Sequence, residues 1–169
     1  MSISKLVGLI THGRASALSD KGIKSFESET GFALPVDYRG FLTSSNGGEL
    51  RESLEARWVS ALYQGGYGNA VVSRFYSIGD SGHQNVRPLT TVFKEMEVSV
   101  SDVPNGIFVI GEDDLGNQIT IDLRSKNRGQ IALVDHETVG DHFSDEETYQ
   151  VVANSFEEFV RMLHAGNQG

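Results

Sequence analysis

The stretch FESETGFALPVDYRGFLTSSNGG at residues 26–48 contains the strongest structural signals in the chain. Gly31 favours the left-handed conformation that ends a helix, and Pro35 suits a helix start because it has no amide hydrogen to lose. Three large apolar residues then recur at the spacing of one helical face: Tyr38, Phe41 and Leu42. The Asn-Gly-Gly at residues 46–48 breaks that pattern. The stretch therefore predicts two consecutive helices joined by a short extended hinge, a helical hairpin.

Helical spacing is found elsewhere in the chain as well. The first helix of the hairpin should begin at Ser19, which is a good N-cap. Apolar stripes predict further helices over residues 3–10 and 86–96. The last helix has the clearest start, because Ser155 and Glu158 have the spacing of a capping box, in which each side chain satisfies the other's free backbone amide.

Runs of β-branched and aromatic residues between glycines or polar turns predict strands. These runs are residues 57–63, 70–78, 107–110, 118–123 and 130–134. An antiparallel meander is the simplest connection for the last three, because parallel pairing would need long crossovers. We therefore predict one α+β domain over residues 1–169, with a central antiparallel sheet and with the N-terminal helical hairpin and C-terminal helix packed against it.

Composition narrows the possible functions. The net charge is −9, from 14 Lys plus Arg against 23 Asp plus Glu, which disfavours nucleic acid as a partner and favours a basic protein. The chain has no cysteine, which excludes disulfides and thiolate metal sites and suits a reducing compartment. No apolar run approaches the ~20 residues that a membrane span needs. We expect a cytoplasmic protein that does not enter membranes.

Three motifs resemble catalytic or ligand-binding sites without completing one. Gly79-Asp80-Ser81-Gly82 followed by His83 has the letters of a serine-protease nucleophile, but that family needs two β-barrels and an upstream histidine, so a turn is the simpler interpretation. A calcium loop opening at Asp113 would need a glutamate at its twelfth position, where Arg124 stands. The glycines of residues 65–68 do not complete a dinucleotide fingerprint.

Asp135-His136-Glu137 has the residue types of a metal site or of an acid–base pair. Adjacent residues on a strand point to opposite faces, so these side chains would converge only if the chain bends. A turn at the end of a strand is the favoured interpretation, and a small metal-dependent hydrolase is kept as an alternative. We expect no catalytic residue, no metal and no cofactor.

Three segments in this order resemble the SUKH superfamily, which includes fungal cell-wall regulators and many bacterial toxin-immunity proteins. They are Phe26-Glu27-x-x-x-Gly31-x-x-Leu34-Pro35-x-Asp37-Tyr38-x-x-Phe41-Leu42 ending in Asn46-Gly47-Gly48, then Ile110-Gly111-Glu112-Asp113-x-x-Gly116-Asn117 leading into Ile121-Asp122-Leu123 and to Asp135-His136-Glu137, then Ser155-Phe156-Glu157-Glu158-Phe159. The resemblance spans roughly residues 19–165, and residues 49–103 hold no family motif.

The resemblance implies a binding domain whose shared residues maintain the fold while its variable surface recognises a partner. The predicted function is that of an immunity protein, which binds and neutralises a cognate polymorphic toxin, a nuclease or deaminase in systems of this kind, during contact-dependent competition. A general cytoplasmic interaction module is the alternative. The candidate partner-binding residues are Tyr67, Glu112, Asp113, Asp114, Asp141, His142, Asp145, Glu146 and Glu147. Residues 49–103 should hold the surface that distinguishes this member.

Overall fold

The structure is a computed structural model that describes residues 1–12, 15–60, 66–79, 85–145 and 148–165. The helices are α1 (Ile3–Leu9), α2 (Asp20–Thr30), α3 (Val36–Ser44), α4 (Leu89–Glu95) and α5 (Phe156–Met162). The strands are β1 (Ile10–His12), β2 (Gly48–Val59), β3 (Tyr67–Phe75), β4 (Arg87–Pro88), β5 (Ile107–Asp113), β6 (Gln118–Asp122), β7 (Ile131–Val134), β8 (Gln150–Ala153) and β9 (His164–Ala165). The protein is α+β, as predicted.

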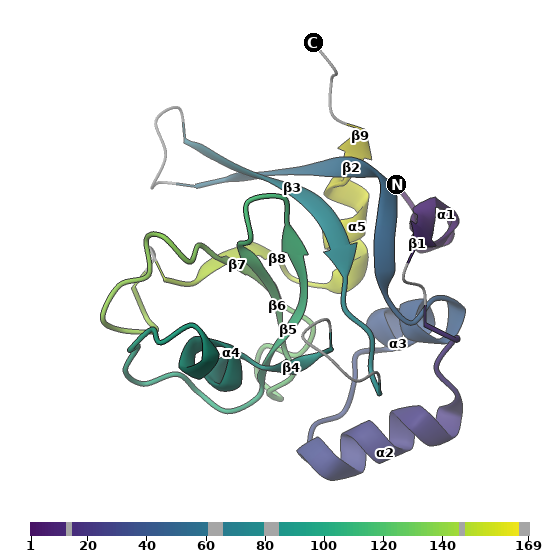
Figure 1. Ribbon diagram of the computed structural model, residues 1–169, viewed down its shortest axis with the longest axis horizontal. Coiled ribbons are helices and arrows are strands. Elements are labelled where there is room, and N and C mark those ends of the chain that lie inside the picture. Colours follow the sequence, from purple (N-terminus) through teal and green to yellow (C-terminus); the bar gives the residue numbers. More distant parts are fainter. Residues whose placement is uncertain (13–14, 61–65, 80–84, 146–147, 166–169) are drawn as a thin grey trace.

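The strands form one sheet in the order β1-β2-β3-β5-β6-β7-β8, with β4 paired to β5 and β9 paired to β2 (Figure 1). Every pairing between these strands is antiparallel. The predicted meander is confirmed as β5, β6 and β7, and it continues into β8.

Several strand predictions differ from the structure. Strand β2 begins at Gly48 rather than at residue 57, because its middle carries exposed polar residues over 51–53, which conceal the strand pattern, and its pairing with β3 shifts register there. Strand β3 covers Tyr67–Phe75 instead of 70–78, and β4 occupies the start of the helix predicted over 86–96. The predicted strand at 57–63 ends at Val59, and residues 61–63 lie outside the described residues.

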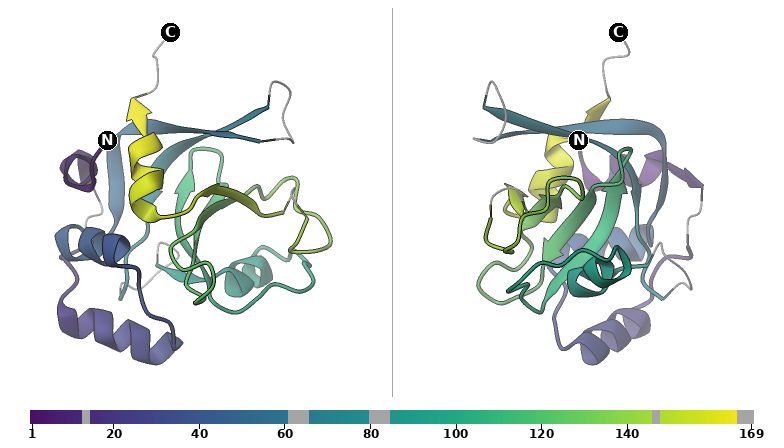
Figure 2. Two further views of the ribbon diagram at one scale, coloured as in Figure 1. Left: turned by 180° about the vertical axis from the view of Figure 1, so that it is seen from behind. Right: turned by 60° about the vertical axis from the view of Figure 1, so that its left-hand side comes forward.

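Helices α1, α3 and α5 contact one another, and α5 also contacts β2 and β8 (Figure 2). Four buried aromatic rings lie at the centre of this packing: Tyr38, Phe41, Phe75 and Phe156. Phe156 has ring centroids at 5.0 Å from Tyr38 and 5.1 Å from Phe41, distances typical of favourable aromatic pairs. On another part of the sheet α4 contacts β4 and β5.

The N-terminal ends of helices α3 and α5 lie next to each other, and the side chain of one aspartate links them. The Asp37 carboxylate accepts hydrogen bonds from the backbone N–H of Tyr38 (2.9 Å) and of Glu157 (2.8 Å). The Ser155 hydroxyl accepts from the N–H of Glu158, as a capping box requires. The reciprocal bond differs from the prediction, since the Glu158 carboxylate accepts from Asn154 N–H. Two distant family segments are therefore joined at this point.

Candidate partner-binding site

The acidic residues Glu112 and Asp113 end β5, and residues 114–117 form the turn that connects β5 to β6. Asp113 is only 3% exposed, and its carboxylate accepts hydrogen bonds from Leu115 N–H (3.0 Å), Asn117 N–H (2.8 Å) and the Asn117 side-chain amide (2.9 Å). Burial raises the pKa of the Asp113 carboxyl, and these hydrogen bonds oppose the rise. Asp113 thus shapes the turn, while Asp114 and Leu115 are exposed at its tip.

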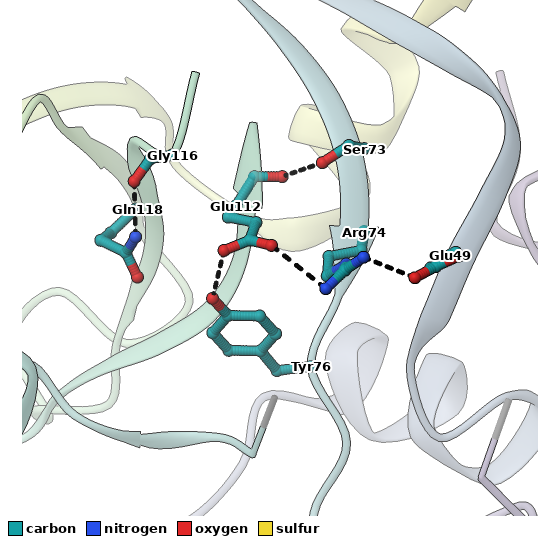
Figure 3. A network of polar contacts seen from close by, with 7 residues as sticks. All are labelled: Glu49, Ser73, Arg74, Tyr76, Glu112, Gly116 and Gln118. Atoms are coloured by element: carbon teal, nitrogen blue, oxygen red, sulfur yellow. Dashed lines mark hydrogen bonds and ion pairs between the residues drawn. The ribbon is translucent and has the colours of Figure 1, made fainter. Parts of the chain in front are cut away.

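Glu112 belongs to a polar network that crosses three strands (Figure 3). Arg74 on β3 forms ion pairs with Glu49 on β2 and, at 3.4 Å, with Glu112 on β5. The Tyr76 hydroxyl donates a hydrogen bond of 2.7 Å to Glu112, and the pKa of Tyr76 is raised by burial and by this carboxylate. The Glu112 charge is thus largely compensated within the protein, which favours a role in joining the strands.

Asp135, His136 and Glu137 form a turn directly after β7. The Asp135 carboxylate accepts a hydrogen bond from Glu137 N–H (2.9 Å), and the His136 ring nitrogen Nδ1 lies 3.1 Å from the Asn117 side-chain oxygen. Among the described residues, no group of three or more His, Cys, Asp and Glu side chains is placed to hold a metal ion. The protease-like motif at 79–83 lies outside the described residues, apart from Gly79.

The loop that follows Gly140 lies beside Ser101. Ser101 donates from its backbone N–H and from its hydroxyl to the Asp141 carbonyl, both at 2.9 Å. The Ser101 hydroxyl is also 2.7 Å from His142 Nδ1, and the Asp145 carboxylate accepts from His142 N–H at 3.1 Å. The structure therefore brings Asp141, His142 and Asp145 together. Glu146 and Glu147 lie outside the described residues.

An open groove of about 840 Å³, the α4 groove, lies between α4 and the segment 97–103, with Asp141 at its border. Four of its lining residues are apolar and buried or half-buried: Phe93, Val98, Val100 and Val103. Four others are charged and exposed: Lys94, Glu97, Asp102 and Asp141. The α4 groove thus combines an apolar interior with a mainly acidic border, and an apolar lining with a few charged groups is typical of ligand-binding clefts.

The segment that forms one wall of the α4 groove is bounded by two unusual backbone conformations. Glu97 and Asp102 have φ angles of 59° and 60°. For residues other than glycine, this left-handed backbone conformation costs roughly 1–2 kcal/mol. Strained conformations of this kind are frequent at functional sites.

Tyr67, the remaining candidate, is 50% exposed and lies in the β2–β3 ribbon. Its ring is stacked by the Arg57 guanidinium, whose Cζ is 4.3 Å from the ring centroid, and it pairs across the strands with Val59, which is 80% exposed. Figures 1 and 2 show this end of the ribbon projecting well away from α4. Tyr67 and the α4 groove are therefore separate surfaces.

A family model for the SMI1 / KNR4 family (SUKH-1) matches residues 17–162. The chain belongs to the SUKH-1 family. A comparison with curated proteins found no match. In this SUKH-1 protein the family segments carry many internal contacts: Glu27 accepts from Leu34 N–H and pairs with Arg39, and Asn46 exchanges two hydrogen bonds with the backbone of Ile78. No helix among the described residues is long and apolar enough to span a membrane.

The sequence patterns gave no prediction of the α4 groove of this SUKH-1 protein. The groove depends on residues 97–103 lying beside residue 141, which a local pattern does not indicate. The sequence did indicate the region of the groove. Residues 49–103 were expected to hold the distinguishing surface, and all residues that line the groove except Asp141 lie within 90–103. The role of Asp37 at the start of α5 was also missed, since its partner lies far away in sequence.

Proposed function

We propose that this SUKH-1 protein is an immunity protein, which neutralises a cognate bacterial toxin by binding it. The observation that carries the proposal is the family match over residues 17–162, because the superfamily includes toxin-immunity and regulatory proteins that act by binding. In this proposal the protein acts in the cytoplasm as one domain, without catalysis and without a cofactor.

The charge of the protein supports a basic toxin as the partner. A net charge of −9 attracts a cationic protein over distances of about 8–10 Å at physiological salt and raises the association rate. Exposed carboxylates at Asp114 and Asp141, and the half-buried carboxylate of Asp145, would contribute to this attraction. The complex should therefore form faster at low salt than at high salt.

Co-expression with the product of the neighbouring open reading frame tests the proposal. We expect that product to arrest growth when it is expressed alone. Co-expression of this protein should restore growth, and the two proteins should elute together as a complex. A harmless neighbour that does not bind would contradict the proposal. A harmless neighbour that does bind would favour the alternative, a regulatory interaction module.

A further inference from the structure

We propose that the α4 groove docks a partner segment in which lysine or arginine side chains alternate with apolar ones. This inference rests on the proposed function, because the segment is taken to belong to the toxin, and it deepens that function by naming the contact surface and its chemistry. Shape, charge and preorganisation each support it.

The shape of the α4 groove fits a segment of polypeptide. Its volume of about 840 Å³ is within the range of ligand-binding clefts, and Phe93 and Val100 offer apolar contact along its interior. Burying apolar side chains there is favourable because it removes apolar surface from water, so the partner segment should carry apolar groups.

The charge of the α4 groove specifies the rest of the segment. Its border has three carboxylates, Glu97, Asp102 and Asp141, against the single cation Lys94. Within the described part of the chain, no lysine or arginine forms an ion pair with these carboxylates. Asp102 has His142 as an ionisable neighbour, with 3.9 Å between the His142 ring nitrogen Nδ1 and the Asp102 carboxylate. Cations from a partner would complete this border, whereas nucleic acid would be repelled by it.

The walls of the α4 groove are held in place before a partner arrives. Ser101 bonds to the Asp141 carbonyl, accepts a hydrogen bond from Phe143 N–H at 3.0 Å, and so ties segment 97–103 to the loop opposite. Glu97 at the start of the wall and Asp102 near its end both have left-handed backbone conformations. A preorganised site loses less conformational entropy on binding, which favours its use for recognition.

The test uses a variant that removes the acidic border and leaves the backbone undisturbed. The substitutions are Glu97→Asn, Asp102→Asn and Asp141→Asn, since asparagine tolerates positive φ better than most residues do. The matched control removes the same charge from exposed or half-exposed positions elsewhere: Glu52→Gln, Glu55→Gln and Glu137→Gln. Both variants have the same net charge, so differences between them report position rather than total charge.

The first probe is the toxin identified by co-expression. We expect the groove variant to bind it about tenfold to a hundredfold more weakly than the wild type, as the loss of three exposed ion pairs implies, and the control variant to change affinity by roughly threefold at most. A toxin that binds the groove variant as tightly as the wild type would overturn the docking site while leaving the immunity function intact.

The second probe is a short labelled peptide alternating lysine with leucine, compared with one that alternates glutamate with leucine. It is measured by fluorescence anisotropy and by amide chemical shifts. We expect the lysine peptide alone to bind, to shift residues 90–103 and 141, and to lose affinity in the groove variant. An equal loss of peptide affinity in the groove variant and the control variant would overturn the inference. Chemical-shift changes centred outside residues 90–103 and 141 would also overturn it. If the lysine peptide binds the α4 groove but the neighbouring gene product proves harmless, the immunity function is contradicted and the docking site is not.

Discussion

At the residue scale, several polar residues of the family segments bond to the backbone of the protein itself. Asn46 is the plainest example, because its side-chain amide donates to the Ile78 carbonyl (2.8 Å) and accepts from the Ile78 N–H (2.9 Å) in a buried position. Gly47 follows with a φ of 75°, and a Cβ atom there would lie 2.6 Å from the Tyr76 backbone. These residues hold α3, β2 and the end of β3 together.

Replacing Asn46 by leucine should destabilise the fold by about 2–5 kcal/mol, because it leaves the buried Ile78 N–H and carbonyl without partners. The free energy of unfolding in urea measures the effect. Asn69→Leu is the matched control, since Asn69 is exposed on β3 and should change stability by no more than about 0.5 kcal/mol. Equal effects at the two positions would show that the Asn46 hydrogen bonds contribute little.

The backbone at Glu97 gives a second prediction at this scale. Both Glu97→Gly and Glu97→Ala remove the charge, but only glycine relieves the left-handed conformation at φ 59°. The glycine variant should therefore be more stable than the alanine variant by about 1 kcal/mol, measured from the thermal midpoint and unfolding enthalpy. An alanine variant as stable as the glycine variant would mean that the wall of the α4 groove carries no strain there.

At the element scale, sequence patterns located the helices better than the strands. The predicted start of α2 at Ser19 and its end at Gly31 are confirmed, since Ser19 accepts from Gly22 N–H and Gly31 has a φ of 76°. Local caps and 3.6-residue spacing determine such helices. The short edge strand β8 was not predicted, because its four residues include exposed Val151 and depend on β7 for pairing.

The β2–β3 ribbon depends on a close contact between Trp58 and Gly68. A Cβ atom at residue 68 would lie 2.5 Å from the indole ring, which is 7% exposed. Gly68→Ala should displace the ring, move its fluorescence emission to longer wavelength and destabilise the fold by roughly 1–3 kcal/mol. Trp58 is the sole tryptophan, so the emission reports this site alone. Unchanged emission and stability would contradict the contact.

At the scale of the whole molecule, the candidate site was less predictable than the fold. The resemblance indicated the family, whereas the candidate partner-binding residues were chosen for their charge and expected exposure, and one of them, Asp113, is buried and bonded within its own turn. The α4 groove exists because α4, segment 97–103 and residue 141 meet in the folded chain. Only tertiary structure brings such residues together.

Burial of tyrosines predicts how the whole fold responds to alkali. Burial raises the pKa values of Tyr38 and Tyr76 well above their ordinary range and that of Tyr149 to about 12. An unfolded tyrosine has a pKa of about 10, so above that pH the native state binds more protons than the unfolded state, and stability falls as pH rises. Absorbance at the phenolate band should show these three ionising together with unfolding. Ionisation of Tyr38, Tyr76 and Tyr149 near pH 10, with the fold intact, would contradict this prediction.

The central claim is that the family residues build the scaffold and that the α4 groove recognises the partner. Hydrogen exchange of this protein, alone and in complex with the toxin identified by co-expression, tests the claim most directly. We predict that binding slows exchange at residues 90–103 and 141–145, with little change in α2, α3 and the β5–β6 turn. Protection centred on those family segments, with residues 90–103 unchanged, would contradict the account.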